Sequence, residues 1–438
     1  MTAVTRFAPF TRLGNDVRPH EFRAVALAFL CNFVLLGSYY VLRPVRDAMA
    51  TVIGADQLQY LFTGTLLFTL LCAPLYAWLT DTFRLSRVLP GVFWFWIINI
   101  LIFHALFTSV PGNRWLAAAY YWWFSVVNLF MISVFWSLMV DLFSPGQATR
   151  LFAVIAGGGS TGAIAGPVLT RAFVGVVGVS GMLLIAAAGF LIVIVLVHLL
   201  MREKQQLQSE HAEVQASTLD HRLSGTSWDG FRALFSSAYT MNQALFMLLM
   251  TWIATIAYFM QTDLISRAFV GIEARTVALA DIDLVVNICS AAVLLFGLGR
   301  YIVRFGVTAA LALNPVLMVI AFVAVALSPT MLMLQAMQVV RRVSQYAIAR
   351  PSREICFTVV PQANRYKAKN VIDTVVYRFG DLSAAWVQAA LRALGLGSGG
   401  ALGLGLLASG AWGLVSVALG RRYEQLRRAG AGAPPEGR

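Results

Sequence analysis

The sequence predicts an all-α polytopic membrane protein. Of the 438 residues, 59% are hydrophobic and only 12% are charged, whereas average soluble domains are about 45–50% apolar and about 25% charged. The mean hydropathy of +0.74 agrees with this. Long apolar runs occur along the whole chain, which a signal peptide or a single anchor would not produce. A soluble enzyme would need far more surface charge, so the composition excludes that class.

The apolar runs predict twelve transmembrane helices, because crossing a bilayer takes about 20 apolar residues. We place them at about 24–46, 58–79, 88–109, 117–140, 151–174, 181–201, 242–262, 277–298, 308–327, 330–350, 370–393 and 399–420. The longest polar segment, 202–240, separates one six-helix half at 24–201 from a second at 241–420. A segment 1–23 precedes the two halves, and a tail 421–438 follows them.

The two halves resemble each other weakly in sequence. The stretch RLFAVIAGGGSTGAIAGP from Arg150 in the first half corresponds to RYKAKNVIDTVVYRFGDLSA from Arg365 in the second. Two six-helix pseudo-repeats joined by a cytoplasmic linker are the layout of major facilitator transporters. We therefore expect a fold of the major facilitator type.

The basic residues predict the orientation in the membrane. The chain has 33 basic and 20 acidic residues, for a formal net charge of +13, and in a membrane protein such an excess first indicates the bias of basic residues toward the cytoplasm. With both termini inside, most basic residues fall on the cytoplasmic side, and the opposite loops hold only Arg114, Arg171, Arg267, Arg275 and Arg392. We expect a multi-pass protein of a bacterial inner membrane with both termini cytoplasmic. Because the bilayer accounts for the charge, no nucleic-acid partner is expected.

Ionisable residues inside the apolar spans are candidates for function, because each is costly to bury unless it faces water or a partner. In the first span Arg43, Arg46 and Asp47 share one helix face, and Tyr39 and Tyr40, one turn earlier, could stack on a base. The later spans carry Asp281, Asp283, Arg341, Arg342, Asp373, Arg378 and Asp381. The five cations suit a cavity that admits an anion, since arginine binds phosphate in a bidentate geometry.

Each of these groups also has a structural interpretation. The cations of the first span could simply end it at the outer interface, and the carboxylates of the eighth could lie in the outer headgroup region. The arginines of the tenth span could form structural ion pairs with Asp373 or Asp381. For the eleventh span a charge-balanced network is the favoured interpretation. All five carboxylates are therefore candidates for coupling or ion pairing.

A glycine-rich run between Ala156 and Gly166 is interpreted as a packing surface. It lacks the Gly-Lys-Ser/Thr of a phosphate-binding loop and follows no strand. Gly158, Gly162 and Gly166 are spaced by four, which lets two membrane helices approach closely.

Nothing in the sequence favours catalysis, a metal or a cofactor. The four cysteines lie far apart, the five histidines form no cluster, and no Ser/His/Asp or paired-Glu arrangement stands out. A membrane sensor or assembly protein would have no need for charges inside its spans. We therefore expect a transporter, not an enzyme, that acts as a monomer.

Several blocks resemble the ATP:ADP antiporter family, the nucleotide transporters of plastids and of obligate intracellular bacteria. They are YYVLRPVRDAM, FWSLMVDLFSPGQATRLFAVIAGGGSTGAIAGP, GFRALFSSAY and RPSREICFTVVPQANRYKAKNVIDTVVYRFGDLSAAWVQ. The resemblance implies a twelve-helix fold of major facilitator type that exchanges nucleotides. It also implies functional basic residues at Arg46 and, in the loop before the eleventh span, at Lys367 or Lys369. The family's fourth span usually carries a Glu, for which Asn128 is the nearest polar substitute here.

Together these observations favour an antiporter of a nucleotide or another phosphorylated, anionic solute that works by alternating access. The alternative is a proton-coupled facilitator for an unrelated solute, with Asp47, Asp281 or Asp373 as the proton carrier. An exchanger should run on a gradient of its counter-substrate alone, whereas a proton symporter should stall without a proton gradient.

Overall fold

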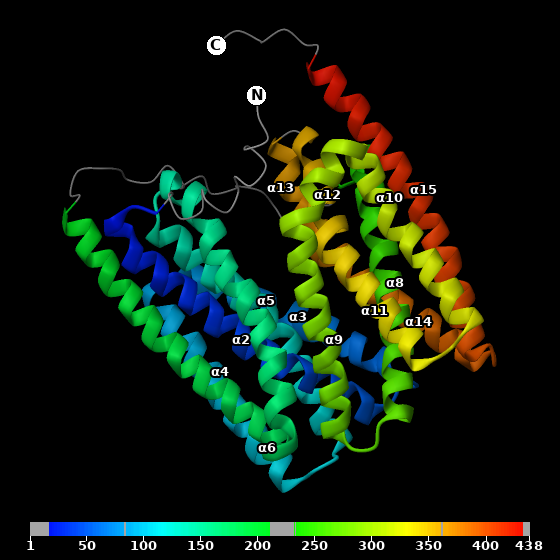
Figure 1. Cartoon of the computed structure of the whole chain (residues 1–438), viewed down its shortest axis with the longest axis horizontal. Helices are drawn as coiled ribbons and strands as arrows, with labels where there is room; N and C mark the ends of the chain where they lie inside the picture. The colour runs from blue at the N-terminus through cyan, green and yellow to red at the C-terminus, as the bar shows by residue number, and fades with distance from the viewer. Residues whose placement is uncertain (1–16, 83–84, 211–231, 233, 361, 432–438) are drawn as a thin grey trace, which may run out of the picture. The chain divides into compact units, whose positions relative to one another are not determined.

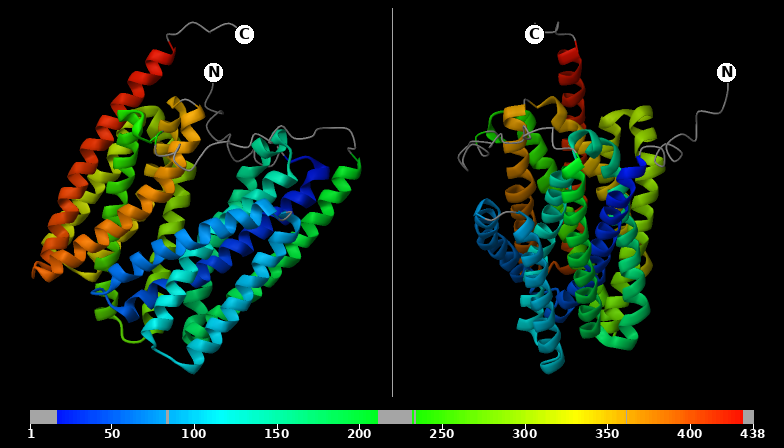
Figure 2. Two further views of the ribbon diagram at one scale, coloured as in Figure 1. Left: turned by 180° about the vertical axis from the view of Figure 1, so that it is seen from behind. Right: turned by 90° about the vertical axis from the view of Figure 1, so that its left-hand side faces the viewer.

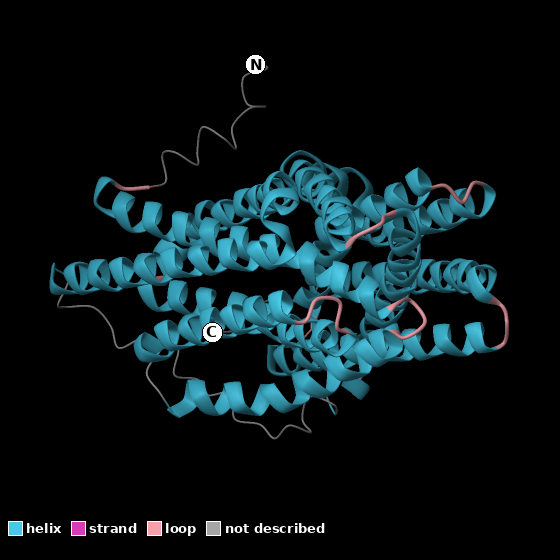
Figure 3. Ribbon diagram, turned by 90° about the horizontal axis from the view of Figure 1, so that it is seen from below, coloured by secondary structure: helices cyan, strands magenta, loops and turns pink. Residues whose placement is uncertain are grey.

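The protein is described here from a computed structural model, which covers residues 17–82, 85–210, 232, 234–360 and 362–431. Within these ranges the chain is helical and contains no strand, as Figure 3 shows. The all-α class predicted from hydropathy is therefore confirmed. Parts of the expected segments 1–23, 202–240 and 421–438 lie outside the described residues.

Two runs of helices make up the described chain (Figure 1). The first comprises η2 (Pro19–Glu21), α2 (Phe22–Ile53), α3 (Leu58–Thr82), α4 (Leu85–Ser109), α5 (Arg114–Leu142) and α6 (Pro145–Glu210). The second comprises α8 (Ala238–Ala268), α9 (Ile272–Ala292), η3 (Val293–Gly297), α10 (Leu298–Leu327), α11 (Met331–Ser344), η4 (Gln345–Ala349), α12 (Arg350–Cys356), η5 (Phe357–Val359), α13 (Gln362–Val371), η6 (Ile372–Val376), α14 (Tyr377–Ala393) and α15 (Gly397–Ala431).

Two glycines in the left-handed region divide the longest helices. Gly178 in α6 has φ 70°, and Gly306 in α10 has φ 83°; residues with a Cβ rarely adopt this conformation. Both fall between spans expected from hydropathy. Among the described residues, seven segments are apolar and long enough to cross a membrane, and two of these, Gly146–Glu203 and Ile272–Leu327, are long enough to cross twice. With α3, α11–α12 and α13–α14 the helices are consistent with twelve spans.

The helices that contain the tenth and eleventh spans extend beyond the expected spans. The tenth helix continues beyond 350 through the π-helical turn η4 and α12 to Cys356, and the eleventh begins at Gln362 in α13 instead of at 370. Lys367 and Lys369 therefore lie on a helix and not in a loop. Of the charged residues outside the expected spans, Glu354 and Lys369 are paired with each other, and Arg353 is paired with Asp373.

The described chain forms two compact units. Unit 1 comprises Met1–Ile53, Leu67–Thr218 and Phe269–Leu284, and unit 2 comprises Gly54–Leu66, Leu219–Ala268 and Val285–Arg438. Compared with the halves expected from chain order, the start of α3 belongs to unit 2 and the first part of α9 to unit 1. In unit 2 the helices α8, α10, α11 and α15 share one core, in which the rings of Phe246 and Trp412 lie 5.3 Å apart.

The pairing of α2 with α6 dominates unit 1 (Figure 2). At three glycines of α6 an added Cβ would collide with the backbone of α2: Gly158 with Phe29, Gly162 with Phe33, and Gly166 with Gly37. Both series advance by four residues, so the glycine face of α6 runs along one face of α2. This close approach fixes the rotation of α2 and therefore the direction in which its late polar residues point.

Candidate functional site

The charged side chains late in α2 form the candidate site of unit 1, which includes an aromatic wall from α5. Arg46 donates from Nε and Nη2 to Asp47 Oδ1 at 2.9 and 2.6 Å. Its guanidinium lies over the rings of Tyr121 and Phe124, at 5.3 and 5.7 Å from their centroids. Cation–π contact of this kind is favourable where water is excluded, and the Arg46 side chain is only 15% exposed.

Arg43 lies one turn earlier and is paired with a different carboxylate. Its Nε lies 3.8 Å from Asp283 Oδ2 of α9, whose residue is 1% exposed. The guanidinium also lies 5.4 Å from the centroid of the Tyr40 ring. Tyr39 meets Tyr40 edge to face and stacks on Phe124 at 5.1 Å. The structure therefore brings the first-span candidates and Asp283 together in one cluster.

The depth of this cluster can be estimated along its own helices. At about 1.5 Å of rise per residue, Arg43 lies about 15 Å from the end of α2 at Ile53. Asp283 lies about 17 Å from the start of α9 at Ile272. A hydrocarbon core is about 30 Å thick, so both groups lie near its middle if these helix ends reach the membrane surface. Because α2 continues past Arg43 and Arg46, neither arginine ends the helix.

Asp281 belongs to a separate, exposed ion pair. Its Oδ1 accepts from Arg171 Nη1 at 2.8 Å, with side chains 37% and 61% exposed. Pairs that are this accessible to water contribute little to stability. Residues two apart on a helix point to different faces, which explains why Asp281 and the buried Asp283 have different partners.

In unit 2, Arg341 is held by two glutamines of its own helix face. Its Nε and Nη2 donate to Gln338 Oε1 at 3.1 and 2.9 Å, and its Nη1 donates to Gln345 Oε1 at 3.1 Å. Gln338 in turn donates from Nε2 to the carbonyl of Ala257 in α8. Sequence reasoning missed both glutamines, although their spacing of i−3 and i+4 from Arg341 was a signal for contact.

The remaining charges of the eleventh span form a second group in unit 2. Arg378 Nη1 lies 3.8 Å from Asp381 Oδ2, and Asp381 Oδ1 accepts from Thr255 Oγ1 at 3.1 Å. In the tenth span, Arg342 follows Arg341 directly and is only 4% exposed. Adjacent helical residues point about 100° apart, so the two arginines were expected to face different surroundings.

A network of ion pairs connects α12 with α13 and η6. Arg353, with a side chain 5% exposed, donates from Nη2 to Asp373 Oδ1 at 2.6 Å and lies 3.4 Å from Glu354 Oε1. Lys369 Nζ lies 2.5 Å from Glu354 Oε2. Lys367 is half-buried on α13. Asp373 and Lys369 are thus brought together with Arg353 and Glu354. Sequence reasoning had not selected the latter two residues. For Asn128, the side chain lies outside the described part of the structure.

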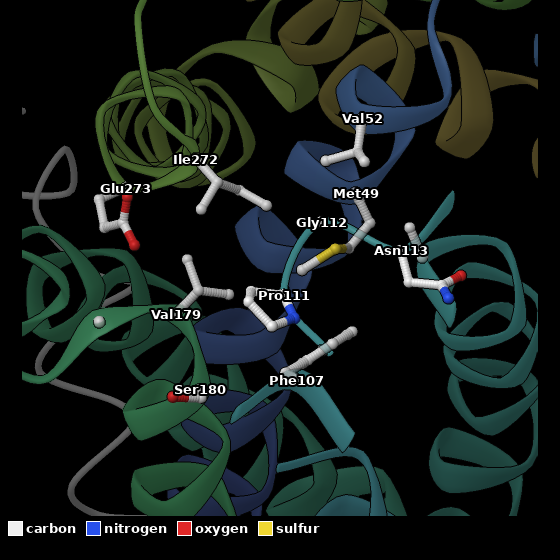
Figure 4. A pocket seen from close by; sticks show the side chains of 12 residues that line it. Met49, Val52, Phe107, Pro111, Gly112, Asn113, Val179, Ser180, Ile272 and Glu273 are labelled. Carbon is white, nitrogen blue, oxygen red and sulfur yellow. The ribbon is translucent and has the colours of Figure 1, made fainter. Parts of the chain in front are cut away.

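A cavity of about 160 Å³ lies in unit 1 at the end of α2 (Figure 4). Apolar side chains dominate its lining, including Met49, Val52, Phe107, Val179 and Ile272, and Glu273 contributes a carboxylate. No residue predicted for the site lines it. Ligand pockets usually measure about 300–1,000 Å³, so this cavity is too small for a nucleotide.

A polar cluster fixes the start of α2. Glu21, which is 2% exposed, accepts from Arg150 Nη2 at 2.9 Å, from Gln147 Nε2 at 3.0 Å and from the backbone N–H of Arg18 at 3.1 Å. Burial alone would raise the pKa of the Glu21 carboxyl. The donors, led by Arg150, outweigh this effect and hold the pKa below its ordinary value.

These helices and charges can be compared with known proteins. Residues 28–346 match the family model of the Major Facilitator Superfamily. The chain belongs to this superfamily. No curated protein sequence matches it significantly. The match supports a multi-pass membrane transporter and does not extend to the ATP:ADP antiporter family.

Solved structures show the same major facilitator fold. The nucleoside transporter NupG is 16% identical, with a TM-score of 0.61 over 94% of this chain and 100% of its own. A bacterial homologue of the iron transporter ferroportin, in an inward-facing state, is 13% identical, with a TM-score of 0.65 over 91% and 99%. A bacterial homologue of the human lysosomal transporter Spinster is 13% identical, with a TM-score of 0.56 over 96% and 100%. Identities this low establish the fold alone.

Proposed function

We propose that this facilitator carries an anionic solute, a nucleotide or another phosphorylated metabolite, by alternating access. The observation that carries the proposal is the cluster of Arg43 and Arg46 at membrane depth beside the rings of Tyr40, Tyr121 and Phe124. Guanidinium groups inside a bilayer are costly and are characteristic of substrate pathways. Their fork of N–H donors matches the oxygens of a phosphate.

The carboxylates of the cluster stabilise the buried arginines when no substrate is bound. Asp47 and Asp283 each lie against one of the two guanidinium groups, so they lower the cost of burying both cations when no anion is bound. An incoming phosphate would compete for the same donors and displace a carboxylate. The aromatic rings offer flat faces to a base or sugar. This competition favours exchange, because one anion can replace another without leaving the arginines bare.

The resemblance to ATP:ADP antiporters favours nucleotides within this class. It rests on Tyr39–Met49, which carries the cluster, and on the block that contains Lys367 and Lys369. Unit 2 has its own cations inside apolar spans, Arg341 and Arg378, of which Arg378 is paired with Asp381. Lys369 is paired with Glu354, so its contribution to anion binding would require that pair to open.

The burial of Asp283 favours proton coupling as a second candidate. Asp283 is 1% exposed and its Oδ2 lies 3.8 Å from Arg43 Nε, so a proton delivered to this carboxylate would release Arg43 for the solute. Proton-coupled transport would use the same site as exchange but would be driven by a proton gradient.

The test is transport by the purified protein in liposomes. Vesicles loaded with ADP should take up labelled ATP without a proton gradient, and uptake should vanish when the ADP is omitted. Labelled adenosine, which has the ring but no phosphate, is the matched control and should not enter. If adenosine enters as fast as ATP, or no phosphorylated solute is carried, the proposal is wrong. Uptake that stops when an uncoupler is added would favour the proton-coupled version.

A further inference from the structure

The last helix of unit 2 carries an exposed stripe that changes from apolar to basic. Leu407 and Leu414 of α15 are 75% and 76% exposed, and Arg421 and Arg428 continue the stripe at the same spacing of seven residues. Residues seven apart on a helix lie on nearly the same face. Leucines that are this exposed on a membrane-spanning helix face lipid, so the two arginines lie on the lipid-facing side of α15.

The arginines of α15 lie close to the level of the phospholipid headgroups. The helix runs for 35 residues, Gly397–Ala431, and at about 1.5 Å per residue Arg421 lies about 36 Å from its start. The hydrocarbon core of a bilayer is about 30 Å thick, and the headgroups extend it to about 40–45 Å. Arg422 follows directly. Arg427 and Arg428 lie one to two turns further on, where α15 extends beyond the other helices of unit 2 (Figures 1 and 2), and long side chains can reach back to the headgroups.

A neighbouring turn adds two more arginines to this end of unit 2. Arg300 and Arg304 are exposed and lie just before the helix break at Gly306. Gly306 itself lies against α15, since a Cβ built on it would be 3.5 Å from Glu424 Oε1. The turn and the basic part of α15 therefore adjoin. Together they form what we call the basic surface of unit 2, which consists of Arg300, Arg304, Arg421, Arg422, Arg427 and Arg428.

The surroundings of the basic surface suit a lipid. Glu424 is the one acidic residue of the sequence between Arg421 and Ala431, and its carboxylate is turned to α10, where it accepts from Thr308 Oγ1 at 2.7 Å. Val303 and Phe305, which are 89% and 55% exposed, add apolar side chains. Basic groups beside exposed apolar ones are typical of protein segments at an anionic membrane interface.

We propose that the basic surface of unit 2 binds the phosphate groups of anionic phospholipids in the leaflet at the carboxyl end of α15. Six guanidinium groups are complementary to the negative charge of such headgroups, and the donor fork of each matches the oxygens of a phosphodiester. The exposed leucines of the same helix face meet the acyl chains. The proposal goes beyond the solute site and does not depend on it, because it concerns the lipid-facing surface of one unit.

The test measures lipid binding by the purified full-length protein. Its melting temperature is followed as phosphatidylglycerol, which is anionic, or phosphatidylcholine, which is zwitterionic, is added, and the lipid that stays bound is counted by native mass spectrometry. One variant combines Arg421→Gln, Arg422→Gln, Arg427→Gln and Arg428→Gln, and a second replaces the same four arginines by lysine. Arg114→Gln, which removes an exposed arginine of unit 1, is the control.

Phosphatidylglycerol should raise the melting temperature of the wild type and of Arg114→Gln, and phosphatidylcholine should not. Each basic residue near an anionic surface favours binding by a factor of about five, so the four-glutamine variant should bind phosphatidylglycerol about a hundredfold or more weakly. The four-lysine variant keeps the charge and should retain most of the binding. Because the four side chains are exposed, melting without added lipid should not change.

Each other outcome has a definite meaning. Equal binding of phosphatidylglycerol by the wild type and the four-glutamine variant would overturn the proposal, and so would equal stabilisation by phosphatidylcholine. If soluble glycerol 3-phosphate stabilises the wild type as well as the lipid does, the surface binds a free anion and the proposal is wrong. A wild-type dimer that the glutamines convert to a monomer would identify an interface between copies instead. Should the four-glutamine variant not fold, Arg427→Gln with Arg428→Gln makes the same comparison beyond Tyr423, the last buried residue described in α15.

Discussion

Replacing Gly162 by alanine tests the packing on which the unit 1 site depends. The Cβ of the new residue would collide with the carbonyl of Phe33 and would lie 3.0 Å from the backbone nitrogen of Gly37. Real Cβ atoms almost never come this close to backbone atoms. Since both neighbours belong to the backbone of α2, no side chain can rotate away, and α2 would have to move off α6.

The cost can be estimated from known effects of overpacking. Inserting one methyl group into a tightly packed interior typically costs about 1–3 kcal/mol. Alanine regains about 0.5–1 kcal/mol of helix preference over glycine. For a unit of 150–250 residues, 1 kcal/mol shifts the melting temperature by about 2–4 °C. We therefore expect Gly162→Ala to melt several degrees lower, and Gly162→Leu to fail to fold or to close.

Gly175 on the same helix provides the matched control. A Cβ at Gly175 would meet no atom within 4 Å, so Gly175→Ala should melt at the same temperature as the wild type or slightly higher. Both proteins are purified in the same detergent and their unfolding is followed by intrinsic fluorescence. Equal melting temperatures for the two variants would refute the close approach of α2 and α6.

Three further predictions concern the site, the orientation and the membrane surface. Arg46→Ala should weaken anion affinity by about tenfold to over a hundredfold, from a loss of 1.5–3 kcal/mol, and Arg46→Lys should weaken it less; unchanged affinity in folded Arg46→Ala would remove the residue from the site. Reporter fusions at Gly225 and Gly430 should both report the cytoplasm, and a periplasmic signal from either would contradict the orientation. Glu21→Gln should melt below the wild type at neutral pH. Because the folded pKa of Glu21 is lowered, its stabilisation is complete above the ordinary pKa of about 4.3 and is lost as the pH falls below it. A difference in melting temperature that persists unchanged at pH 3 would refute the pairing with Arg150.

The helical fold was predictable because hydropathy reports directly on the bilayer. The helix breaks near Gly178 and Gly306 could be predicted, because the apolar runs are interrupted there. The boundaries of α12 and α13 could not be predicted, since hydropathy treats each charge as exposed to water. Arg353 and Asp373 are paired at 2.6 Å, and such pairing depends on two helices meeting, which a window along one segment cannot detect.

The candidate site was predictable in its cations and not in their partners. Arg43 and Arg46 stand out because arginine is rare in an apolar run. That Asp283 lies against Arg43 depends on tertiary packing across a long stretch of chain. The glutamines around Arg341 are different, because their contact is local to one helix face. They were overlooked because the search was for charges, and glutamine side chains are neutral.

The balance of charge in the unit 1 cluster bears on how an anion could be carried. In unit 1 the positive charges of Arg43 and Arg46 are matched by Asp47 and Asp283, so this cluster is close to neutral before any solute arrives. A nucleotide or sugar phosphate brings about two negative charges or more, and at membrane depth such a charge needs compensation. The compensation has to come from protonation of a carboxylate or from a cation whose charge is not cancelled. The first route couples transport to protons, and the second permits exchange without them.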